Sequence, residues 1–241
     1  MRLEIDDVLR EATRLCQDEK EQDAEILVTA ALIDHPNNLD LLTKLGFIQT
    51  RLCKDEDAES TFQSVIAGNP DHEEAICGFG RLLDQSLRVD EAESLYRDYL
   101  ERNPSSHCVI DDLCRLLISE ERENEALEIA RKHIQQFPSE INAYDALRYS
   151  LVMTEERLSE ELDNKESVNA TLNILTNLVE QLTVINRIRQ ELDTTSLPER
   201  ELLDEKSRIA GEIEYVFSSA QTRGISIPEE IVTSVDMLLK L

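Results

Sequence analysis

Hydrophobic and polar positions follow the three- and four-residue spacing of amphipathic helices over the segment 5–140. Residues 73–106 contain two such apolar faces. The first face holds Ile76, Phe79, Gly80 and Leu83, and the second holds Ala92, Leu95, Tyr96 and Tyr99. The pattern stops near Arg88 and again before Pro104, and proline cannot continue a helix. The sequence therefore predicts two helices joined by a tight turn.

The same helix pair recurs at a fixed interval along the chain. Prolines keep this interval at Pro36, Pro70, Pro104 and Pro138, and alanines keep it at Ala24, Ala58, Ala92 and Ala126. A small residue in the first helix recurs at Ala12, Gly46, Gly80 and Cys114. A fixed period of this length indicates stacked supersecondary units, and the small residues would let the two helices of each unit approach closely.

These residues resemble the tetratricopeptide repeat family, whose 34-residue helix pairs carry Leu-Gly in the first helix. Leu45-Gly46, Phe79-Gly80 and the repeated alanines and prolines carry the resemblance. It implies an all-α fold, a right-handed α-solenoid of four helix pairs with a capping helix. The units would span 5–38, 39–72, 73–106 and 107–140, and the capping helix 141–153, so that the solenoid covers residues 5–153.

The repeat breaks after residue 153. Residues 154–166 are mostly charged and polar, which predicts a solvated helical extension or a joint; the absence of Gly and Pro favours the extension. Residues 167–241 are expected to form three helices, packed as a hairpin or a small bundle. The first of them carries an apolar stripe at Val168, Leu172, Leu175, Val179, Leu182, Ile185 and Ile188. The second is expected to start at Leu197-Pro198-Glu199, and the third at Ile227-Pro228-Glu229-Glu230.

Charge excludes one class of partner. The 241 residues carry 51 acids against 25 Lys and Arg, a formal net charge of −26. Neither half offers a basic tract for phosphate backbones, so we expect no nucleic-acid partner. A salt-rich cytoplasm and an acidic partner-binding domain would both explain this composition.

Other sequence features favour a cytoplasmic, non-enzymatic protein. No run of 18 apolar residues predicts membrane insertion, and the first residues lack a hydrophobic signal core. The five cysteines have no Cys-x-x-Cys spacing, which is consistent with reduced thiols. No metalloprotease, phosphate-loop or nucleophile-elbow motif occurs, so we expect no catalytic residues, no metal and no cofactor. His133 falls on a packing face and is expected to be a core histidine.

The faces of the first helices that do not pack are expected to line a concave groove. The predicted partner-binding residues are Thr43, Phe47, Arg51, Cys77, Arg81, Asp84, Asp111, Arg115, Ile118, Asn142, Asp145 and Tyr149, with Leu9 and Thr13 on the first helix. Arg51, Arg81 and Arg115 could hold a partner carboxylate together. The competing interpretation is that Asp84 and Asp111 neutralise Arg81 and Arg115 within their own helices, and we favour it.

Two functions remain compatible with the sequence. The first is an adaptor that binds a peptide or helix of a protein partner in the groove. Some tetratricopeptide co-chaperones bind acidic chaperone tails with Lys and Asn residues, but Asp111 and Asp145 stand on the corresponding surface here, which disfavours that activity. The second is a structural element that forms a homodimer through the C-terminal amphipathic helices.

Overall fold

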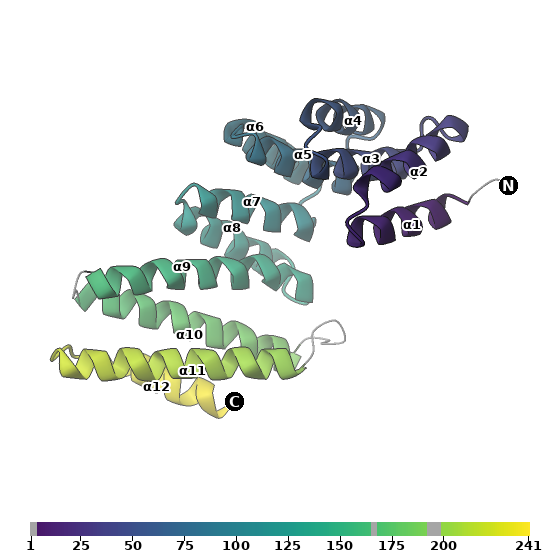
Figure 1. The fold of residues 1–241 in the computed structure, drawn as a ribbon. Coiled ribbons are helices and arrows are strands. Elements are labelled where there is room, and N and C mark those ends of the chain that lie inside the picture. The colour runs from purple at the N-terminus through teal and green to yellow at the C-terminus, as the bar shows by residue number, and fades with distance from the viewer. Residues whose placement is uncertain (1–3, 165–167, 192–198) are drawn as a thin grey trace. The chain divides into compact units, whose positions relative to one another are not determined.

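The computed structural model describes residues 4–164, 168–191 and 199–241, which form helices with no strand among them (Figure 1). The repeat region contains α1 (Ile5–Gln17), α2 (Glu21–Asp34), α3 (Leu39–Arg51), α4 (Asp55–Gly68), α5 (Glu73–Gln85), α6 (Val89–Arg102), α7 (His107–Ser119) and α8 (Glu123–Gln136). A 3-10 turn, η1 (Ile141–Tyr144), precedes α9 (Asp145–Asn164), α10 (Val168–Glu191), α11 (Glu199–Thr222) and α12 (Glu229–Lys240). The starts of α1, α3, α5 and α7 keep the interval of the sequence repeat, and so do those of α2, α4, α6 and α8. The all-α solenoid prediction is confirmed.

Contacts divide the chain into two compact units, Met1–Leu116 (unit 1) and Leu117–Leu241 (unit 2). The predicted division at residue 153 stays a prediction. Residues 154–164 continue α9 as a helix, as the extension requires, whereas 165 and 166 lie outside the described residues. The helix start expected at Leu197-Pro198 also lies outside them. Among the described helices, none combines the length and the apolar composition that a membrane span requires.

The repeated small residues lie at close helix–helix contacts. The four periodic alanines are completely buried. A Cβ atom added to Gly80 of α5 would lie 2.2 Å from Cζ of Tyr96 in α6, and one added to Gly46 would lie 2.7 Å from the ring of Phe62 in α4. The sequence predicted this close approach, and the structure shows that one aromatic ring of the second helix fills the space at each glycine.

Each tight turn contains a residue with left-handed backbone, at the same place in every repeat. These residues are Glu19, Cys53, Leu87 and Glu121, with φ of 58°, 55°, 59° and 59°. The N–H of the residue that follows donates a hydrogen bond to a carbonyl oxygen in the last turn of the first helix. Arg88 N, for example, donates to Leu83 O at 2.8 Å. This geometry ends many helices and is usually occupied by glycine, so the absence of glycine hid it in the sequence.

Replacing Leu87 with glycine is expected to stabilise the protein. Left-handed backbone costs a non-glycine residue about 1–2 kcal/mol, and glycine loses about 0.5–1 kcal/mol more conformational entropy on folding, so the net gain is about 0.5–1 kcal/mol. Leu87 is 88% exposed, so little packing is lost. Urea unfolding of Leu87→Gly measures the gain. Leu87→Ala removes the same side chain but keeps the left-handed strain, and equal stability of the two variants would contradict the explanation.

The cations that follow α3 and α5 connect neighbouring repeats. Lys54 and Arg88 occupy the N-caps of α4 and α6, beyond the ends of α3 and α5. Their side chains pair with acids of the preceding second helix: Lys54 with Glu25 at 2.7 Å, and Arg88 with Glu59 at 2.7 Å. These pairs join neighbouring repeats within unit 1.

In unit 2, α10 packs against α9, α11 and α12 (Figure 1). Most of the apolar stripe predicted on this helix is used in that packing. Leu175, Leu182, Ile185 and Ile188 are at most 1% exposed, whereas Val168 is exposed. His133 is buried beside Phe137, as expected for a core histidine.

Candidate functional site

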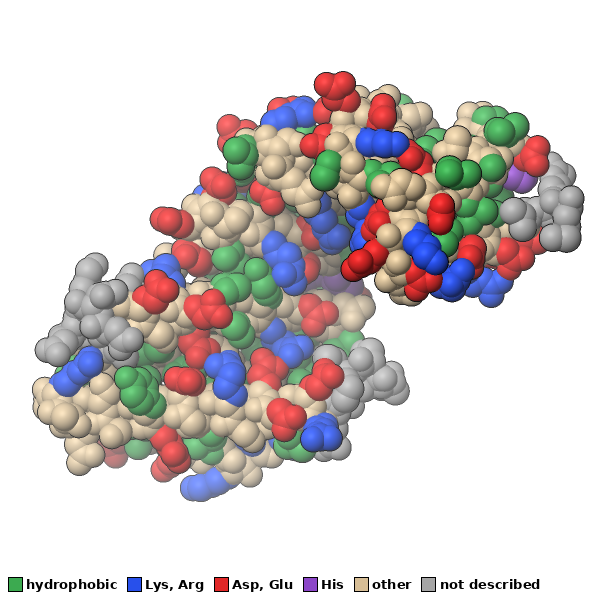
Figure 2. Space-filling model, viewed as in Figure 1, with side chains coloured by type: hydrophobic (Ala, Val, Ile, Leu, Met, Phe, Trp, Pro, Cys, Tyr) green, Lys and Arg blue, Asp and Glu red, His purple; other side chains and the backbone are tan. Residues whose placement is uncertain are grey.

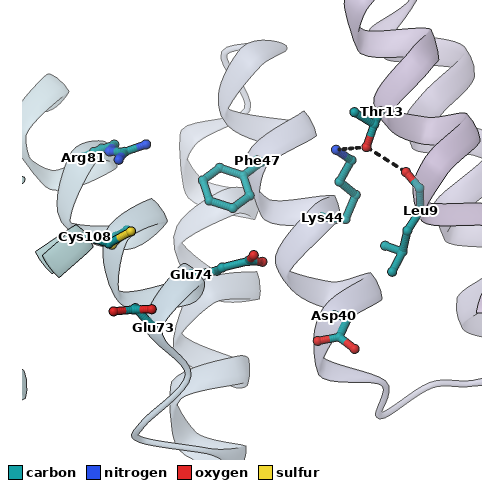
Figure 3. A pocket seen from close by; sticks show the side chains of 10 residues that line it. Leu9, Thr13, Asp40, Lys44, Phe47, Glu73, Glu74, Arg81 and Cys108 are labelled. Carbon is teal, nitrogen blue, oxygen red and sulfur yellow. Dashed lines mark hydrogen bonds between the residues drawn. The ribbon is translucent and has the colours of Figure 1, made fainter. Parts of the chain in front are cut away.

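A cavity of about 620 Å³ opens on one face of unit 1. Its lining comes from the first helices of the repeats: Leu9 and Thr13 of α1, Asp40, Lys44 and Phe47 of α3, Glu73, Glu74, Cys77 and Arg81 of α5, and Cys108 of α7 (Figure 3). The second helices contribute none of these residues. We call this cavity the groove.

Five of the residues expected to line a groove do so: Leu9, Thr13, Phe47, Cys77 and Arg81. Thr43 is only 1% exposed, because its face of α3 packs inside unit 1. Arg51, Asp84, Asp111 and Arg115 also belong to unit 1 but do not line the cavity. Ile118, Asn142, Asp145 and Tyr149 belong to unit 2, and their part in a partner-binding surface stays a prediction.

Arg81 is held by a buried carboxylate at the edge of the groove. Its Nε and one terminal nitrogen donate to Asp112, at 3.0 and 2.8 Å. Asp112 is 4% exposed, and burial raises the pKa of this carboxyl although Arg81 opposes the shift. The Arg81 side chain itself remains 57% exposed. Its guanidinium is therefore fixed in direction while one face stays open to solvent.

The three arginines do not form a shared carboxylate site. Arg51 donates to Glu21 at 2.9 Å and to the backbone oxygen of Cys16 at 3.0 Å. Arg115 pairs with Asp111 at 2.8 Å, as the competing interpretation predicted. For Arg81 that interpretation named the wrong acid, because Asp112 of α7, not Asp84 of α5, is its partner. Each arginine thus already has a carboxylate partner within unit 1.

The other charged side chains of the groove are Asp40, Lys44, Glu73 and Glu74. Among the described residues, none of the four forms an ion pair between an Asp or Glu and a Lys or Arg. The ammonium of Lys44 donates to Oγ1 of Thr13 at 2.8 Å, and Thr13 donates to the backbone oxygen of Leu9 (Figure 3). The carboxylate of Glu73 accepts a hydrogen bond from the hydroxyl of Ser106. The carboxylate of Asp40 lies 3.5 Å from Nε2 of His72. Within the described ranges, no Lys or Arg pairs with the groove carboxylates.

The groove thiols are not set up for catalysis. Burial raises the pKa of the Cys77 thiol far above its usual value, and nearby Asp112 adds to the shift. Burial also raises the pKa of Cys108. A nucleophilic cysteine requires the opposite shift, so both thiols act as small apolar surfaces near neutral pH. Nowhere in the described part of the chain do three His, Cys, Asp or Glu side chains gather closely enough to hold a metal ion.

Sequence reasoning missed half of the lining: Asp40, Lys44, Glu73, Glu74 and Cys108. A signal for them existed. Asp40, Glu74 and Cys108 each lie one repeat apart, so they form one more row of equivalent positions, about one turn before the row that contains Cys77. The groove extends further toward the N-terminal ends of the first helices than the predicted surface did.

No protein-family model matches this chain, and no curated protein matches its sequence. Solved structures do match it in fold. A thermophilic TPR protein of Thermus thermophilus, TTC0263, is similar with a TM-score of 0.55 at 15% identity, over 86% of this chain and 98% of its own. This chain has a tetratricopeptide-repeat fold. The MamA protein is similar with a TM-score of 0.50 at 16% identity, over 77% of this chain and 94% of its own. At such identities the likeness shows the tetratricopeptide-repeat fold alone.

Proposed function

We propose that this protein is a non-enzymatic adaptor that binds a peptide or helix of a partner protein in the groove of unit 1. The observation that carries the proposal is the cavity itself, lined by side chains of four successive first helices around Phe47. Phe47 is half-buried and packs edge-on against Phe62, with ring centroids 5.4 Å apart, so its position is fixed before a partner arrives. Preorganised aromatic surfaces lose little entropy on binding.

Site-specific photo-crosslinking tests this function. Two exposed cysteines give matched positions: Cys108 lines the groove, and Cys53 lies in the turn between α3 and α4. The first variant keeps Cys108 and has Cys53 and Cys16 replaced by serine. The second keeps Cys53 and has Cys108 and Cys16 replaced by serine. Each is labelled to completion with a benzophenone maleimide at mildly alkaline pH, because the raised pKa of Cys108 slows its reaction, and is then irradiated in native lysate. We expect one protein segment to be captured from Cys108 and not from Cys53.

Capture of the same proteins from both positions would contradict the proposal, since it would indicate non-specific surface contact. Reversing the charge of Arg81 is a poorer test. A glutamate there would lie against buried Asp112 and destabilise the fold, so lost binding would have two explanations.

Self-association through the C-terminal helices stays a prediction, and the exposed apolar side chains Tyr215 of α11 and Met237 of α12 are the surface left for it. The stripe of α10 is a poor candidate for pairing with a second copy, because most of it is buried inside unit 2. The cytoplasmic location stays an expectation from the sequence. On the face seen in Figure 2, Lys and Arg side chains are interspersed among acidic ones, which agrees with a protein partner rather than a phosphate backbone.

A further inference from the structure

The charges of the groove are sorted along its helices. Asp40 and Glu74 stand in the first turns of α3 and α5, at equivalent repeat positions, with Glu73 beside them. Lys44 follows one turn later on α3, and Arg81 two turns after Glu74 on α5. Figure 3 shows the three carboxylates toward one side of the groove and the two cations toward the other. The groove thus has an acidic edge and a basic edge.

Between these edges lies an apolar floor formed by Leu9, Phe47, Cys77 and Cys108. The two edges differ in how far they are already neutralised. The acidic edge has no Lys or Arg partner among the described residues, whereas on the basic edge Arg81 is paired with Asp112 and only Lys44 lacks a carboxylate. Asp40 and Glu74 are exposed, so each attracts a partner cation only modestly, and the attraction depends on salt.

We infer that the occupant of the groove is an amphipathic helix of the partner, with Lys or Arg on the flank facing Asp40, Glu73 and Glu74, and an acidic flank facing Lys44 and Arg81. This inference rests on the proposed function and specifies its partner. An apolar stripe between two flanks of side chains is a property of a helix. An extended strand turns alternate side chains away from the groove and presents mainly backbone to its edges.

The length of the helix follows from the spacing of the first helices. Packed helices lie about 8–10 Å apart, so the floor from α1 to α7 spans three spacings, about 24–30 Å. At about 1.5 Å per residue this corresponds to a helix of roughly 16–20 residues. Such a helix would cross the first helices, because the lining residues come from four of them.

Designed peptides test the charge pattern directly. Three 18-residue helical peptides share one leucine stripe. The segregated peptide carries Lys on one flank and Glu on the other, the mixed peptide carries the same residues distributed over both flanks, and the neutral peptide carries Gln. We expect fluorescence anisotropy at low salt to show the segregated peptide binding about tenfold more tightly than the mixed one. This advantage should shrink at high salt, since exposed charges are screened.

The acidic edge is tested with a charge-matched pair of variants. Asp40→Asn with Glu74→Gln removes two charges from the groove. Asp55→Asn with Glu56→Gln removes two exposed first-turn charges from α4, outside the groove. We expect the first variant to reduce the advantage of the segregated peptide to less than threefold and the second to leave it unchanged. Equal losses in both variants would overturn the inference, because they would reflect net charge alone.

Peptide direction gives a second readout. Interchanging the two flanks forces a bound helix to turn end for end, so that its basic flank still meets the acidic edge. A maleimide on one peptide end should react with Cys108 of the Cys53→Ser, Cys16→Ser protein. The segregated and the interchanged peptide should react through opposite ends. Reaction through the same end in both, or no preference between segregated and mixed peptides, would overturn the charge pattern. Either result leaves the proposed function standing if the benzophenone on Cys108 still captures a partner segment.

Discussion

Gly80→Leu is expected to destabilise the protein by about 3 kcal/mol, the upper end of the usual range for overpacking. Even alanine is too large at this position, because its Cβ would lie 2.2 Å from Cζ and 2.4 Å from Oη of Tyr96. Tyr96 is 2% exposed and cannot move its ring without disturbing the core of unit 1. Gly80→Ala should therefore destabilise too, although alanine favours a helix by about 1 kcal/mol. Urea unfolding of both variants measures the loss.

Gly211 is the matched control for this prediction. It lies in the middle of α11, and a Cβ added there would meet nothing within 4 Å. Gly211→Ala should stabilise the protein by about 0.5–1 kcal/mol through helix propensity alone. Glu11→Ala, which removes an exposed pair with Arg14, should change stability little. If Gly80→Ala were as stable as Gly211→Ala, the close contact with Tyr96 would be absent in solution.

Arg208→Met is expected to destabilise unit 2 by about 2 kcal/mol, because it breaks a partly buried ion pair. Arg208 of α11 donates to the buried carboxylate of Glu155 in α9 at 2.9 Å and to Gln181 of α10 at 2.9 Å. Without Arg208, Glu155, which is 6% exposed, would remain as a buried charge without a cation. Breaking a fully buried pair costs about 3–5 kcal/mol, and the loss is smaller here because the Arg208 side chain is 41% exposed and water can replace part of the interaction.

A double variant distinguishes the loss of a charge partner from the loss of packing. Glu155→Leu with Arg208→Met removes both charges and should recover part of the lost stability, since apolar residues can replace a buried ion pair. Recovery should be partial because Gln181 would lose its hydrogen bonds with Glu155 and Arg208. Of these side-chain hydrogen bonds it would keep the one that it donates to Asn177, at 2.8 Å. Urea unfolding, with hydrogen exchange of α9 to α11 as the local readout, measures both variants. A double variant less stable than Arg208→Met would contradict the argument.

The sequence alone determined the repeat architecture of this protein. Alanines and other small residues recur at a regular period. The contacts between the two helices of each pair recur with them, so the helices of successive repeats begin at equivalent positions. The sequence also identified Gly80 as a contact point and His133 as a core residue, both confirmed by burial. These features depend on residue size and spacing along one helix, which a linear pattern records well.

Only the tertiary structure decided which charged residues of the groove form ion pairs and which do not. Arg81 has Asp84 nearby in sequence but pairs with Asp112, 31 residues away, because adjacent first helices bring several acids within reach of one guanidinium. Arg51 also has a partner distant in sequence, Glu21, which lies on the second helix of the preceding repeat. The acidic edge lies about one helical turn away from the predicted surface. The left-handed residues such as Leu87 were hidden because none of them is glycine, the residue that usually marks this geometry in a sequence.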